Sequence, residues 1–162
     1  MKKITLFITG FIFMSVFTFG QMQEGDIKLF QQLFGTEKMA LVKNYMALTP
    51  QQDSVFWSDY NDYETSRLEL GKRRIKLVED YAKNYMTLTE DKATELIEES
   101  NAIDVEFKKL QKTYYKKMTK SVGAMKAAQF YQFESYLNNV INISIQENIP
   151  YVGELEQMRG KK

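Results

Sequence analysis

The long central part of this sequence has almost no residues that interrupt helices. Between Pro50 and Pro150 the chain contains no proline, and glycine occurs only at positions 71 and 123. Proline and glycine are the strongest signals for turns and chain breaks, so an interval that nearly lacks both favours long helices. The sequence therefore predicts an all-α protein.

Apolar and aromatic residues recur along this interval at steps of three and four. This spacing describes one face of a helix that packs against neighbouring helices at coiled-coil spacing. Two rows define the face of the first long helix: Phe56, Tyr63, Leu70 and Leu77 in one, and Tyr60, Arg67, Arg74 and Tyr81 in the other.

The turns between the predicted helices are short. We expect about four helices, at residues 37–47, 50–85, 90–119 and 124–148, with Thr36 as the cap of the first. Short links place consecutive helices side by side and antiparallel. The predicted architecture is therefore a hairpin or cradle of long antiparallel amphipathic helices.

One heptapeptide occurs twice and marks two of these corners. Residues 43–49 and 83–89 both read Lys-Asn-Tyr-Met-x-Leu-Thr, with Ala47 in the first copy and Thr87 in the second. A period of about 40 residues is typical of stacked helical units. The repeat therefore indicates architecture rather than chemistry.

Each copy ends in a helix-capping motif formed by Leu48, Thr49 and Gln52, or by Leu88 and Thr89. In the first copy, Thr49 is the N-cap and Gln52 stands at N3, so the two side chains can form a capping box. The second copy keeps the threonine but has a lysine at N3, so it has no capping box.

The N-terminus has the pattern of an export signal. Two lysines precede an uncharged apolar run from Ile4 to Phe19, and small residues allow cleavage before Gln21. We expect a signal peptide at 1–20, a flexible or short helical segment at 21–35, one helical domain at 36–152 and a disordered tail at 153–162. An uncleaved N-terminal anchor is the alternative; with cleavage, no stable membrane span is expected.

Composition excludes several functional classes. The chain has neither histidine nor cysteine, so the usual zinc ligands and Ser-His-Asp or Cys-His triads are absent. Without Lys2 and Lys3, 20 basic residues face 21 acidic residues, which is not the basic surplus of a nucleic-acid-binding protein. We expect no catalytic residues, no metal, no cofactor and no nucleic-acid partner.

Aromatic residues and arginines are the candidates for a protein-binding surface. Adjacent helical residues point about 100° apart, so the rings of Trp57, Tyr115 and Tyr136 should lie partly outside the core. The alternative is that these rings only widen the core seam. The candidate surface comprises Trp57, Tyr60, Arg67, Arg74 and Tyr115.

Several of these patterns together resemble a known family. The LTxxQ motif at 48–52, repeated in weaker form at 88–92, resembles the Spy/CpxP-like envelope stress proteins. FWxxYxxYE at 56–64, AAxFYQxE at 127–134 and IPxV at 149–152 look like a related group of exported helical sensors or regulators linked to extracytoplasmic-function sigma factors. Together the patterns span about residues 40–152, which is most of the mature chain.

The resemblance implies an all-helical periplasmic protein, often a homodimer, whose partners are client or regulatory proteins of the envelope. Its implied function is that of an ATP-independent chaperone, a holdase, in the envelope stress response. The alternative is a regulatory adaptor or sensor for a two-component system or an extracytoplasmic sigma factor. In either case the chain is expected not to be an enzyme.

Overall fold

The computed structural model describes residues 37–159, and all of their regular structure is helical. The predicted all-α fold is therefore confirmed for this range. The predicted signal peptide at 1–20, the segment at 21–35, the Thr36 cap and the last three residues lie outside the described part of the chain.

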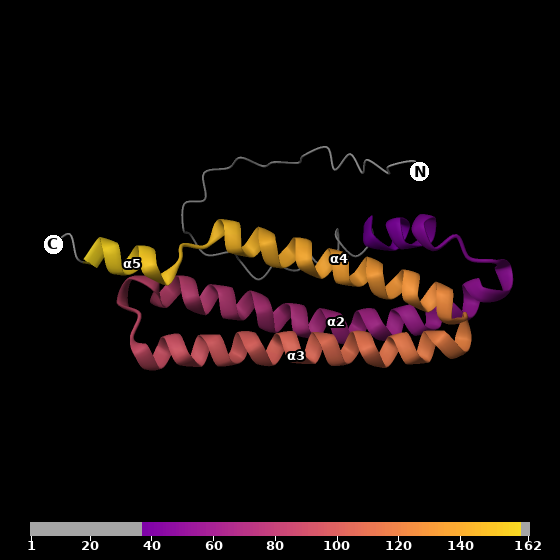
Figure 1. Cartoon of the computed structure of the whole chain (residues 1–162), viewed down its shortest axis with the longest axis horizontal. Helices are drawn as coiled ribbons and strands as arrows, with labels where there is room; N and C mark the ends of the chain where they lie inside the picture. Colours follow the sequence, from indigo (N-terminus) through magenta and orange to yellow (C-terminus); the bar gives the residue numbers. More distant parts are fainter. Residues whose placement is uncertain (1–36, 160–162) are drawn as a thin grey trace.

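Three long helices form the body of the molecule (Figure 1): α2 (Pro50–Asn84), α3 (Glu90–Ser121) and α4 (Ala124–Asn148). Residues 37–46 form a helical segment before them, the short 3-10 helix η1 (Tyr85–Thr87) follows α2, and α5 (Val152–Arg159) ends the described chain. Helices α2 and α3 are antiparallel, and α4 packs along them. The segment 37–46 lies beside the first half of α4 (Figure 1).

Both repeated threonines cap a long helix. The Thr49 hydroxyl accepts a hydrogen bond from the Gln52 N–H at 3.4 Å, and the Gln52 Oε1 accepts one from the Thr49 N–H at 3.2 Å. These two bonds form the capping box. The Gln52 Nε2 also donates to the Val122 carbonyl at 3.0 Å, so the box joins the start of α2 to the turn between α3 and α4. At the second corner Thr89 accepts from the Lys92 N–H at 3.2 Å, without a capping box.

The packing is densest where α2 begins, α3 ends and α4 begins. Nine buried residues form this cluster: Val42, Met46, Phe56, Tyr60, Tyr63, Met118, Val122, Ala127 and Phe130. Two smaller clusters follow along the bundle, one around Leu70, Ile103 and Phe107, and one around Tyr85, Leu88 and Leu96. The core thus becomes thinner toward the far end of the bundle.

The C-terminal region corrects one prediction. Residues 153–162 were expected to be disordered, but Val152–Arg159 is helical. The Tyr81 hydroxyl donates to the Pro150 carbonyl at 2.6 Å, so the chain is held on the bundle just before α5. The Glu154 N–H donates to the Tyr151 carbonyl at 3.0 Å at the start of this helix. Sequence alone could not show this contact, because Tyr81 is far from Pro150 along the chain.

The two copies of the repeat leave their helices differently. Ala47 has a φ of 41°, which is the left-handed region that favours glycine. In the second copy, Tyr85–Thr87 instead forms the 3-10 helix η1, and among the described residues Ala47 is the only non-glycine residue with positive φ. Two copies that differ only at Ala47 and Thr87 therefore make two different corners.

We predict that Ala47→Gly raises the free energy of unfolding by about 0.5 kcal/mol. Left-handed backbone costs a non-glycine residue about 1–2 kcal/mol, while added freedom of glycine in the unfolded chain removes about 0.4–1 kcal/mol of that gain. Thr87→Gly is the matched control and should lower stability, because η1 has no positive φ to relieve. Urea unfolding of both variants checks this, and equal losses in the two would contradict it.

Candidate functional site

A buried lysine joins three helical elements. Lys38 is 2% exposed, and its Nζ contacts the carboxylates of Glu64 on α2 and Glu134 on α4, the latter at 2.9 Å. Glu134 is itself 3% exposed. An ammonium group loses its hydration on burial, so it is stable here only because two carboxylates replace the water. This ion cluster therefore fixes residues 37–46 against both helices.

Neighbouring side chains complete the cluster. The Arg67 guanidinium donates to both oxygens of Glu64, with Nε 2.9 and 3.0 Å away, and the Tyr63 hydroxyl donates to Glu134 at 2.9 Å. The Lys38 ammonium also lies 5.5 Å from the centre of the Tyr63 ring. We call Lys38, Tyr63, Glu64, Arg67 and Glu134 the Lys38 cluster; its two cations match its two carboxylates.

The two carboxylates of the cluster have opposite pKa shifts. Burial raises the pKa of Glu134, and the nearby Glu64 charge adds to this, while Lys38 offsets only part. Burial also acts to raise the pKa of Glu64, but Lys38 and Arg67 outweigh it, so that pKa lies below its ordinary value. Glu64 is therefore the carboxylate that stays ionised most firmly.

The Lys38 cluster sets an antiparallel register between residues 37–46 and α4. Lys38 meets Glu134, the Tyr45 ring stacks on Phe133 with centroids 5.2 Å apart, and the Met46 carbonyl accepts a hydrogen bond from Lys126. Residues nearer the N-terminal end of the segment therefore contact residues nearer the C-terminal end of α4. The described chain begins at residue 37, next to Lys38, whereas α4 continues beyond Glu134 to Asn148.

This second half of α4 carries apolar side chains that the described residues leave uncovered. Tyr136, Val140 and Ile143 are 53%, 39% and 54% exposed, and Leu137 and Ile141 beside them are half-buried. We call these five residues the apolar face of α4. From Ser135 to Gln146 the helix has no charged residue, which makes this stretch unlike the ion-paired outer faces of α2 and α3.

Three residues of the predicted binding surface lie inside the bundle instead. Tyr60 is 1% exposed, and the side chain of Arg67 is 11% exposed in the Lys38 cluster. The side chain of Arg74, also 11% exposed, donates to Asp104 at 2.6 Å and to Asn142 at 2.6 Å. These contacts correct the prediction for Tyr60, Arg67 and Arg74, because α3 and α4 cover the α2 row that carries them.

The two remaining aromatic candidates are half-buried. The Trp57 indole N–H donates to Asp53 at 2.8 Å, and the Tyr115 ring meets the Tyr131 ring edge-on at 6.0 Å. Both side chains are used in packing within the chain. Only Tyr136, the third predicted exposed ring, lies on a surface with other exposed apolar residues.

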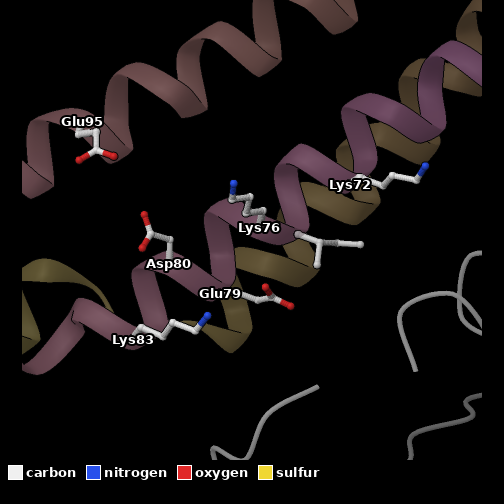
Figure 2. Close-up of a pocket in the computed structure, with 7 residues that line it drawn as sticks. Lys72, Lys76, Glu79, Asp80, Lys83 and Glu95 are labelled. Atoms are coloured by element: carbon white, nitrogen blue, oxygen red, sulfur yellow. The ribbon is translucent and has the colours of Figure 1, made fainter. Parts of the chain in front are cut away.

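A shallow groove of about 630 Å³ lies along the distal part of α2 (Figure 2). Its charges balance, because three lysines face three carboxylates: Lys72, Lys76 and Lys83 with Glu79, Asp80 and Glu95, and Ile75 completes the lining. An open lining with balanced charges offers no site that selects an anion, a cation or an apolar ligand. The groove therefore is not the candidate site.

Between residues 37 and 159 no group of three acidic, histidine or cysteine side chains is placed to hold a metal ion. In the same range no helix is both long enough and apolar enough to cross a membrane. The apolar face of α4 is therefore the surface feature that most needs a functional explanation.

Sequence reasoning missed both the Lys38 cluster and the extent of the apolar face. Lys38 falls in one helical row with Val42 and Met46, and a lysine in an apolar row was the available signal. For α4, the sequence carries one apolar row at steps of three and four, formed by Ala127, Phe130, Phe133, Leu137, Ile141 and Ile145. The apolar residues on its other side, Tyr136, Val140 and Ile143, were the signal that this helix has more apolar surface than one interface can bury.

We predict that Lys38→Met lowers the free energy of unfolding by about 3–5 kcal/mol, because it leaves buried carboxylates without their cation. Adding Glu134→Gln should recover part of this loss, since the Gln side chain carries no charge. Lys72→Met, which removes an exposed pair with Glu69, is the control and should cost less than about 1 kcal/mol. Urea unfolding measures all three; a Lys38 loss no larger than the Lys72 loss would refute the assignment.

The opposite pKa shifts predict opposite pH dependences for two variants. The pKa of Glu64 is lower in the folded than in the unfolded chain, so its ionised form stabilises the fold above about pH 4.5. This stabilisation is lost as the pH falls through the pKa of Glu64 in the folded protein. The difference in unfolding free energy between the wild type and Glu64→Gln should therefore shrink. The pKa of Glu134 is higher in the folded than in the unfolded chain, so the wild type gains stability as this carboxylate is protonated on the way down to about pH 4.5. The variant Glu134→Gln cannot gain in this way. The difference in unfolding free energy between the wild type and this variant should therefore grow. Unfolding free energies measured between neutral and acidic pH test this. If the stability differences of the two variants changed in the same direction with pH, the opposite pKa shifts of Glu64 and Glu134 would be refuted.

Comparisons of the chain with protein-family models, curated proteins and solved structures find no match. The resemblance to the Spy/CpxP-like proteins therefore stays a prediction that rests on the sequence patterns. In the described residues, the apolar face of α4 is the candidate site.

Proposed function

We propose that this chain is a non-enzymatic periplasmic protein that binds other proteins in the envelope stress response, as an ATP-independent holdase. The observation that carries the proposal is the apolar face of α4. Its residues are exposed or half-buried in the described structure and adjoin one another on a single helix. The expected export signal supports the location.

An uncharged apolar helix face suits the binding of unfolded segments. Contiguous exposed apolar residues mark interaction sites more often than single ones do. Between Ser135 and Gln146 the polar residues are amides and hydroxyls, so no charge opposes the approach of an apolar client. The surrounding surface is different, because exposed ion pairs such as Lys72–Glu69 and Arg73–Glu106 keep it hydrated.

The spacing of the same residues favours a second candidate function. Tyr136, Val140 and Ile143 stand at i, i+4 and i+7, which is the spacing of anchors that a defined partner groove recognises. A regulatory adaptor or sensor for an envelope-stress signalling system would use such anchors. It would bind one partner tightly and would not protect unrelated clients.

We predict that the chain suppresses light scattering by an aggregating client at equimolar ratio, and that Val140→Ser with Ile143→Ser weakens this. Binding should fall about tenfold or more. Val140 and Ile143 are only 39% and 54% exposed, so each has about half of the roughly 1.5–3 kcal/mol of full burial still to gain, and together they contribute about 1.5 kcal/mol or more. Ile97→Ser with Val105→Ser on α3 is the matched control: both residues are exposed, at 62% and 67%, but lie outside the apolar face of α4.

Two outcomes decide between the functions. A holdase suppresses scattering of several unrelated clients, and the α4 variant loses this while the α3 control keeps it. Absence of suppression with every client would sink the holdase proposal. If instead the α4 variant alters transcription of an envelope regulon without changing bulk aggregation, the adaptor function is supported.

A further inference from the structure

The outer side of the second half of α3 carries a row of lysines. From residue 107 to residue 121 the sequence contains six lysines and no acidic residue. Five of these lysines, all exposed, fall within about 120° of the helix circumference: Lys108, Lys109, Lys112, Lys116 and Lys120. The buried residues of this half, Phe107, Gln111 and Met118, lie on the opposite side of the helix. We call the five exposed residues the lysine face of α3, which runs along one edge of the bundle in Figure 1.

The lysine face has no counter-charge in the part of the chain that the structure describes. None of its five ammonium groups forms an ion pair with a residue between positions 37 and 159. The sixth lysine, Lys117, is turned toward α2 and pairs with Asp59 at 3.0 Å and with Asp62 at 2.9 Å. Those two carboxylates are thereby neutralised. The face also differs from the outer side of α2, where Lys72 pairs with Glu69.

Stabilisation of α3 itself does not account for the row. A cation near the C-terminus of a helix interacts favourably with the helix dipole, but this effect falls off within the last turn. Helix α3 ends at Ser121, so the dipole explains Lys120 alone. The four lysines from Lys108 to Lys116 lie farther from the end and repel one another without a partner in the described chain.

We propose that the lysine face of α3 binds the anionic surface of a lipid membrane. Clusters of about four to eight basic residues on an amphipathic helix are typical of surfaces that bind anionic lipids. From Lys108 to Lys120 the face extends about 18 Å along a single helix, so its charges can meet several lipid head groups at once. The phosphate groups of those lipids supply the negative charge that the face lacks within the described chain.

The chemistry of the face favours a membrane over a protein or a nucleic acid. Protein interfaces are enriched in aromatic residues and arginine and depleted in lysine, whereas this face consists of lysines alone. The lysine ammonium is a strongly hydrated charge on a flexible stem, which suits many head groups better than one fixed geometry. A nucleic acid is disfavoured because, without Lys2 and Lys3, 20 basic residues face 21 acidic residues.

The first half of α3 limits the contact to the lysine face. Seven of the residues from 90 to 106 are acidic and one is basic, so an anionic surface attracts one end of the helix and repels the other. Attraction of this kind is weakened by salt, because the screening length is about 10 Å at 0.1 M and about 3 Å at 1 M. The binding is therefore reversible and depends on ionic strength.

Cosedimentation with lipid vesicles tests the proposal. The probes are vesicles of phosphatidylglycerol mixed with phosphatidylcholine, and vesicles of phosphatidylcholine alone. The chain is expressed with its N-terminal region so that any native processing takes place, and every variant is prepared in the same way. The wild type should bind the anionic vesicles more strongly than the neutral vesicles, and 1 M salt should remove this difference.

The test variant is Lys109→Gln, Lys112→Gln and Lys116→Gln together. Each lysine near an anionic membrane strengthens binding by about fivefold, so the triple variant should bind about a hundredfold more weakly. Replacing the same three residues by arginine should retain binding, because the charge is kept. Circular dichroism should show unchanged helicity in both variants, since glutamine and arginine are helix formers as good as lysine.

The matched control removes the same charge from the groove on α2, whose charges balance: Lys72→Gln, Lys76→Gln and Lys83→Gln. This variant should still bind the anionic vesicles. Equal losses in the two glutamine variants would overturn the lysine face, because net charge alone would then explain the binding.

Other outcomes reassign the contact. Equal binding of the wild type to both kinds of vesicle, or a loss of binding in Val140→Ser with Ile143→Ser, would overturn the proposal in favour of the apolar face of α4. Binding of poly-glutamate in solution as strong as binding of anionic vesicles would overturn it in favour of an acidic protein partner.

The membrane contact does not depend on the holdase function, and the two fail in distinguishable ways. Anionic vesicle binding through the lysine face, without protection of any client, retains the membrane contact and refutes the holdase function. Client protection by a chain that binds no vesicles retains the holdase function and refutes the membrane contact.

Discussion

The ammonium group of Lys38 lies almost without solvent between the carboxylates of Glu64 and Glu134. Removing such a charge from water costs several kcal/mol, and only well-placed opposite charges offset the cost. The attraction is therefore specific in position: helical segment 37–46 can be stable in this place only where Lys38 reaches both carboxylates. That single requirement sets the direction of the segment, its register on α4 and the part of α4 that it leaves uncovered.

Stabilising contacts are unevenly distributed along the bundle. Near the start of α4 the helices share the large aromatic and aliphatic cluster, in which Phe130 contacts the rings of Phe56 and Tyr63. Farther along, α4 is held by polar contacts, as where Arg74 donates to Asn138 and Asn142. Directional bonds of this kind hold a helix in place without covering its outer side. The second half of α4 is thus fixed and still has an open apolar face.

Helix positions were predictable because they depend on local chemistry. Thr49 with Gln52, and Thr89 alone, cap the helices where the sequence placed the caps. Burial was less predictable, since a heptad row shows which face is apolar but not how many neighbours cover it. Tyr60 and Arg74 were assigned to a surface for this reason, although Phe130 of α4 packs against Tyr60, and α3 and α4 both contact Arg74. Lys38 has its partners 26 and 96 residues away, and no local pattern connects them.

The repeated heptapeptide separates what local sequence determines from what tertiary contacts determine. Both copies place a threonine cap, and the first also meets α4, where Gln129 donates to the Tyr45 carbonyl at 2.6 Å and Lys126 donates to the Met46 carbonyl. Those bonds satisfy backbone carbonyls at the C-terminal end of the helical segment. The chain then turns through Ala47, whose backbone is left-handed. At the second copy the equivalent tyrosine, Tyr85, is buried beside Tyr81, and the chain turns through η1. The threonine therefore acts as a cap in both places, and the first copy is also anchored to α4. The first copy ends the segment that carries Lys38, and it contacts the start of α4. Lys38, at the other end of the segment, contacts Glu134. The apolar face of α4 therefore begins beyond Glu134, next to Lys38, and lies far from the repeat.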